Sequence, residues 1–145
     1  MENNNLDVLD EINKGATMGM DAIKVIMDKT EDDTFKEVLN IEYDKYQDIS
    51  NRVNKIYDNY STEKEPHETN VMNKMMTWYG IQMRTMNEKT ISHYSELLMQ
   101  GTNMGIIEGR KLINHNTDLP DDINKVLHDF VTMQEDSVET LKKYL

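Results

Sequence analysis

Cysteine is absent from this chain of 145 residues, which excludes disulfides, thiolate metal sites and cysteine nucleophiles. Proline occurs only at Pro66 and Pro120, so long stretches contain no residue that would interrupt a helix. No run approaches 18 apolar residues, so the sequence offers no candidate for a membrane-spanning helix. The opening Met-Glu-Asn-Asn-Asn lacks the basic and then apolar order of a signal peptide, and we therefore expect a cytoplasmic protein.

Basic residues are scarce relative to acidic ones. The chain has 16 lysines and arginines against 27 aspartates and glutamates, which gives a formal net charge of -11. This charge repels phosphate backbones and anionic headgroups, so we expect neither nucleic acid nor a membrane as partner. The length fits one domain that spans residues 1–145.

Apolar residues recur at steps of three and four, and runs of alternating β-branched residues are missing. This periodicity predicts an all-α protein. Helices are expected over residues 6–29, 33–61, 68–86 and 91–114, and from the start signal at 118–122 to residue 144. One unbroken helix over residues 68–114 would be about 70 Å long. We therefore place a break at residues 87–90, which makes the third helix short.

Two of the expected helix starts carry capping residues. Asn4 or Asn5 can cap the first helix, and Thr30 and Asp33 have the spacing of a capping pair at the second. Pro120 lies in the first turn of the last helix, where a missing backbone N–H costs nothing.

A glycine motif occurs twice, as Gly15-x-x-Met18-Gly19 and as Gly101-x-x-Met104-Gly105. Glycine inside a helix costs roughly 0.5–1 kcal/mol relative to alanine, so both pairs need a packing reason. Glycines four residues apart clear one helical face, which predicts a close contact between the first and fourth helices. Leucine at Gly19 or Gly105 should then cost several kcal/mol by overpacking.

The repetition extends beyond the glycines. At an offset close to that of the glycine motifs, the stripe Phe35, Val38, Leu39 and Val53 corresponds to Ile123, Val126, Leu127 and Leu141. Two such helical hairpins form an antiparallel four-helix bundle with a long crossover. An additional short helix precedes the third bundle helix, and the whole is a ferritin-like topology.

The segments KGATMGMDAI and ISHYSELLMQGTNMGIIEGRKLI, with the helix start LPDDI, resemble the ferritin-like superfamily, and most closely an uncharacterised bacterial family within it. In catalytic members, two helices each supply a Glu and two supply Glu-x-x-His, and these side chains bind two metal ions. This chain has no Glu-x-x-His. Lys45 stands three residues after Glu42, and neither Gln134 nor Glu135 is followed by a histidine at that spacing. The resemblance therefore implies the fold without the di-iron chemistry, and we expect no metal and no cofactor.

Glu42 lies on the apolar stripe of the second helix, where a carboxylate needs a partner. Tyr46, Gln134 and Glu108 are in phase to form a buried polar network with it. One interpretation of the network is a vestigial metal site or a small-ligand site. The alternatives are a purely structural core network, or a Glu42 at the edge of the stripe that reaches solvent.

The expected short helix is rich in methionine. Thioether groups can bind Cu(I), but the helical spacing of these residues favours an adaptable apolar face. Aromatic and methionine side chains are also enriched at association surfaces, which indicates a homodimer or another protein partner; for Trp78, the alternative is packing over the end of the bundle. The interface candidates are Met72, Met75, Met76, Trp78 and Met83.

No constellation of side chains in the sequence specifies a reaction. The four histidines have no second histidine three or four residues away, which argues against a zinc or iron site. We therefore expect a non-catalytic structural or protein-interaction bundle. The alternatives are a remnant of a metal-binding or di-iron oxidase protein, or a binder of small ligands in the bundle core.

Overall fold

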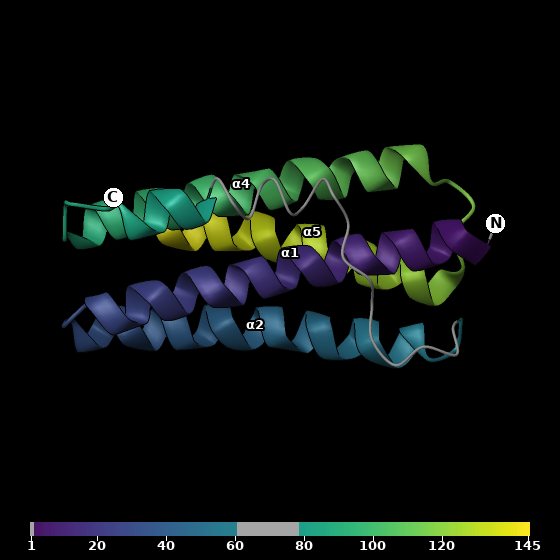
Figure 1. The fold of residues 1–145 in the computed structure, drawn as a ribbon, viewed down its shortest axis with the longest axis horizontal. Coiled ribbons are helices and arrows are strands. Elements are labelled where there is room, and N and C mark those ends of the chain that lie inside the picture. Colours follow the sequence, from purple (N-terminus) through teal and green to yellow (C-terminus); the bar gives the residue numbers. More distant parts are fainter. Residues whose placement is uncertain (1, 61–78) are drawn as a thin grey trace.

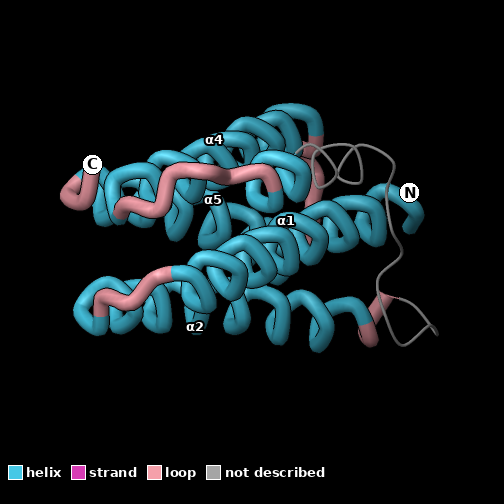
Figure 2. The backbone as a smooth tube through the Cα atoms, turned by 60° about the vertical axis from the view of Figure 1, so that its left-hand side comes forward, coloured by secondary structure: helices cyan, strands magenta, loops and turns pink. Residues whose placement is uncertain are grey.

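The computed structural model describes residues 2–60 and 79–145, and all regular secondary structure within these ranges is helical (Figure 2). Four long helices lie within the described residues: α1 (Glu2–Lys29), α2 (Asp33–Tyr57), α4 (Ile91–His115) and α5 (Asp121–Lys142). Residues 79–84 form a further helical segment. The all-α prediction is confirmed for the described residues, while most of the helix expected at 68–86 lies outside them.

The first hairpin differs from expectation at its helix ends. α1 begins at Glu2, so Asn4 and Asn5 lie inside the helix and the predicted cap there is wrong. α2 is capped by Asp32, whose side chain accepts a hydrogen bond from the Phe35 backbone N–H at 2.8 Å. The predicted Thr30 and Asp33 capping pair is therefore also wrong, because a neighbouring aspartate takes the capping position.

The second hairpin follows the predicted boundaries closely. Residues 86–90 are not helical, which confirms the predicted break. Thr90 caps α4 and accepts a hydrogen bond from the His93 backbone N–H at 3.1 Å. Pro120 is the N-cap residue of α5 and directly precedes the first turn, in which it was predicted to lie. Asp121 and Asp122 in that turn interact favourably with the positive end of the helix dipole.

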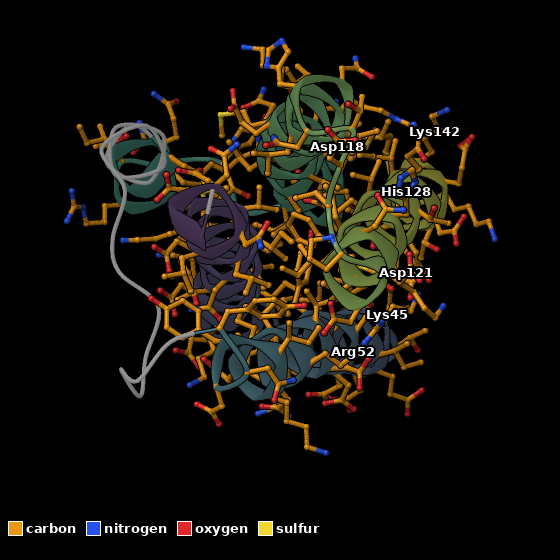
Figure 3. All side chains as sticks on the ribbon, turned by 90° about the vertical axis from the view of Figure 1, so that its right-hand side faces the viewer. Lys45, Arg52, Asp118, Asp121, His128 and Lys142 are labelled. Atoms are coloured by element: carbon orange, nitrogen blue, oxygen red, sulfur yellow. The ribbon has the colours of Figure 1, made fainter. Side chains whose placement is uncertain are left out.

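The long helices lie side by side in two antiparallel hairpins, α1 with α2 and α4 with α5 (Figure 1). α2 and α4 run in the same direction, so the chain passes from one end of the bundle to the other between them. The hairpins pack with α1 against α4 and α2 against α5, and the view along the bundle shows these four helices around a common core (Figure 3). Lys45 and Arg52 lie on the side of α2 that faces α5.

The predicted apolar stripes meet in this core. Among the fully buried side chains are Leu9, Ile12, Phe35, Leu39, Val53, Ile123, Val126 and Leu127. At the boundary of the hairpins, Arg52 of α2 donates a hydrogen bond to Asp129 of α5 at 2.8 Å. Partial burial raises the pKa of Asp129, but hydrogen bonds from Arg52 and Lys125 outweigh it, so the pKa is lowered overall. Of the helices described, none has the length and apolar character needed to cross a membrane.

Candidate functional site

A cluster of polar side chains lies at the centre of the bundle, where the apolar stripes would otherwise meet. Its members surround a cavity of about 20 Å³ and come from three of the long helices and the 79–84 segment: Glu42 and Tyr46 from α2, Tyr79 from the 79–84 segment, Thr102 from α4, and Gln134 and Ser137 from α5. We call this set the central polar cluster. Glycines of α1 and α4 line the same cavity.

Glu42 is buried, with 5% of its side chain exposed, so the alternative in which it reaches solvent is wrong. Its Oε2 accepts a hydrogen bond from Lys45 Nζ at 2.8 Å, and the Lys45 side chain is 38% exposed. Lysine can do this because its long apolar stem lets the ammonium group reach Glu42 from the edge of the helix. Glu42 Oε1 is buried and has no hydrogen-bond partner among the described residues.

Tyr46 lies one helical turn after Glu42 and is buried beside it. Burial raises the pKa of Tyr46 to about 12; a hydrogen bond with Thr102 opposes this shift, and the Glu42 carboxylate adds to it. The Thr102 hydroxyl donates its hydrogen to the Leu98 carbonyl at 2.7 Å. Tyr46 is therefore a neutral phenol at physiological pH and serves as a hydrogen-bonding group.

Tyr79, Thr102 and Ser137 belong to the cluster but were not predicted as members. The Tyr79 hydroxyl donates a hydrogen bond to the Leu97 carbonyl of α4 at 2.9 Å. Burial, together with the neighbouring Tyr46, raises the pKa of Tyr79 well above its usual value. The only sequence signal for Thr102 was its place directly after Gly101, in the repeated glycine motif.

The glycines make room for side chains of other elements. A Cβ atom added to Gly19 would lie 2.6 Å from the Tyr46 ring, and one added to Gly101 would lie 2.5 Å from the Tyr79 ring. At Gly105, an added Cβ would collide with the Gln134 side-chain amide. α1 and α4 do pack against each other, but the atoms nearest to Gly19, Gly101 and Gly105 are side-chain atoms of other elements. Gly15, the fourth glycine of the two motifs, also lines the central cavity.

Glu108 does not join the cluster, contrary to expectation. Its side chain is 23% exposed and forms an ion pair with Lys111 at 3.6 Å. The buried face of α4 runs through Gly101, Gly105 and Gly109, at intervals of four residues. Glu108 lies to one side of this face, where it can reach a lysine on its own helix near the surface.

Met83 was predicted to contact a partner, but it is only 3% exposed and belongs to the core of the chain itself. The helical segment at 79–84 lies against α1, where Met18, Val25 and Met83 line one depression, and this contact buries the Met83 side chain. The other interface candidates, Met72, Met75, Met76 and Trp78, lie outside the described residues.

The cluster offers hydroxyl, amide and carboxylate groups, of which Glu42 alone is charged. In residues 2–60 and 79–145, no group of three or more His, Asp or Glu side chains is arranged to hold a metal ion. His93 lies in the first turn of α4, with its Nδ1 at 3.3 Å from a carboxylate oxygen of Glu88, and it does not line the cavity. No protein-family model, curated protein or solved structure matches this chain.

Proposed function

We propose that this protein is a non-catalytic helical bundle of ferritin-like topology with a structural or protein-interaction role. The observation that carries the proposal is the small number of metal-ligating side chains in the central polar cluster. An oxygen-activating di-metal centre uses about four carboxylates and two imidazoles. The cluster contains one carboxylate, Glu42, and that carboxylate already forms an ion pair with Lys45 of its own helix.

The size of the cavity supports the same conclusion. Ligand-binding pockets commonly measure about 300–1,000 Å³. The central cavity measures about 20 Å³, because Tyr46, Tyr79 and Gln134 fill the space beside the glycines. A substrate would have to displace at least one of these buried side chains, which argues against a catalytic site in the core.

The proposed ferritin-like topology includes an internal duplication. In the first hairpin, Tyr46 of α2 occupies the space beside Gly19 of α1; in the second, Gln134 of α5 occupies the space beside Gly105 of α4. The two glycines are repeat equivalents, and so are the two inserted side chains, at nearly the same offset in the sequence. This shared arrangement is what an ancestral hairpin copied once would leave behind.

For a protein partner, we favour the groove between α2 and α5. It measures about 480 Å³ and is lined by Ile41 and Met133 together with charged side chains that include Asp44 and Arg52. Ile41 is 58% exposed, although it belongs to the residue types most often found buried. Apolar side chains surrounded by charged ones are typical of association surfaces. Homodimerisation through Met72, Met75, Met76 and Trp78 remains a separate proposal.

Elemental analysis of protein purified without chelator tests the proposal directly. We expect less than one equivalent of iron or manganese per chain, and no oxygen consumption when Fe(II) is added. About two equivalents of metal in the wild type, lost in Glu42→Ala and kept in Glu108→Ala, would instead establish the metal-binding alternative. Glu108→Ala is the matched control, because it removes a carboxylate of the same bundle that does not line the cavity.

A further inference from the structure

Two buried polar atoms at the central cavity have no hydrogen-bond partner among the described residues: Glu42 Oε1 on α2 and Gln134 Nε2 on α5. Both residues line the cavity. Buried polar groups in folded proteins are nearly always hydrogen-bonded, and each exception needs an explanation. Two such atoms beside one cavity point to a common partner inside it.

The chemistry of the two atoms restricts what that partner can be. A carboxylate oxygen only accepts hydrogen bonds and an amide nitrogen only donates them, so a molecule that bridges them must donate to Glu42 and accept from Gln134. An ammonium ion cannot accept, and a bare metal ion cannot donate. Water does both, and a buried water commonly has about three polar partners.

The volume selects water as well. A cavity needs about 10–15 Å³ to hold one water molecule, and this cavity measures about 20 Å³. One water therefore fits, whereas an organic ligand does not. Ordering a single water also costs less free energy than leaving two buried polar groups unpaired.

We infer that the central cavity is a binding site for one water molecule, which donates a hydrogen bond to Glu42 Oε1 and accepts one from Gln134 Nε2. This water links α2 of the first hairpin to α5 of the second. It also gives both oxygens of the buried Glu42 carboxylate a partner: Lys45 donates to one of them and the water donates to the other. The inference goes beyond the proposed structural or protein-interaction role and does not depend on it.

A high-resolution crystal structure of the wild-type protein is the decisive experiment. We expect one density peak, without anomalous signal, at about 2.7–3.2 Å from both Glu42 Oε1 and Gln134 Nε2. A direct hydrogen bond between the two side chains, with no peak in the cavity, overturns the inference. A metal ion, recognised by anomalous scattering and short distances to oxygen, overturns it too.

Magnetic relaxation dispersion, which counts long-lived buried waters in solution, gives an independent result. The double variant Glu42→Leu/Gln134→Leu should lose one such water relative to wild type. Gln100→Leu is the matched control, because Gln100 is an exposed glutamine of α4, and it should lose none. An unchanged count in the double variant contradicts the inference. If that variant does not fold, the wild-type crystal structure still decides.

Discussion

Alanine at Gly19 is the sharpest test of how the glycines position the core. The structure predicts that the added methyl group would lie 2.6 Å from the Tyr46 ring, closer than carbon atoms can pack. Tyr46 is only 4% exposed and its ring is packed inside the core, so it cannot swing into solvent. Either the ring or α1 must shift.

Two effects of opposite sign determine the size of the change. Replacing a mid-helix glycine by alanine stabilises a helix by roughly 0.5–1 kcal/mol. Overpacking a tight core costs about 1–3 kcal/mol. The second effect is larger here because the contact involves ring carbons of a buried side chain, so we expect Gly19→Ala to lower the free energy of unfolding by about 1–2 kcal/mol.

Urea denaturation in a double-mutant cycle with Tyr46→Val isolates this contact. Valine lacks the ring atoms that approach Gly19, so in that background Gly19→Ala should become stabilising by about 0.5–1 kcal/mol. Gly80→Ala is the control, because an added Cβ there has no atom within 4 Å, and it should be neutral or slightly stabilising.

Additivity would refute the reasoning. If Gly19→Ala changes the free energy of unfolding equally in the wild-type background and in the Tyr46→Val background, the two residues are not coupled and the glycine has another role. A change at Gly19 no larger than that at Gly80 would have the same meaning.

Three further predictions concern the ion pair, the buried phenol and a helix cap. Lys45→Met should lower the free energy of unfolding by about 1–3 kcal/mol, because it leaves the Glu42 carboxylate buried without its counter-ion. The control is Lys142→Met, which breaks the exposed ion pair with Glu139. A loss in Lys45→Met no larger than that in the control would contradict the prediction. Wild-type stability should decline as pH rises from 10 toward 12, because the folded-state pKa of Tyr46 is about 12 and only the unfolded chain ionises this group near pH 10. Urea titrations at about pH 9 and 11 should show a smaller decline in Tyr46→Phe than in the wild type. An equal decline would show that Tyr46 is not the group responsible. Thr90→Ala should cost about 1 kcal/mol in thermal melts followed by circular dichroism, whereas Thr90→Ser should keep most of the stability; equal melting of the two variants would exclude the cap.

The periodicity of the sequence was sufficient to predict the four long helices of the described residues and most of their core. Phe35, Leu39 and Val53 are buried where their spacing placed them, and so is Glu42. The break before α4 was also predictable, because a run of polar residues ends there in a threonine that can cap. Local rules were weaker at the start of α2, where Thr30 and Asp32 are both chemically able to cap and only the path of the turn selects Asp32.

The sequence by itself determined which face of each helix is buried, and it marked the glycines as sites of close approach. Only the tertiary structure decided what approaches them: the rings of Tyr46 and Tyr79 and the amide of Gln134. It likewise placed Glu108 beside Lys111 and brought Thr102 to Tyr46. The physical reason is that helical spacing fixes the direction of a side chain relative to the axis of its own helix. Its neighbours, however, depend on how far each packed helix is rotated and shifted against the others. These rotations and shifts are determined by the packing of all core side chains together.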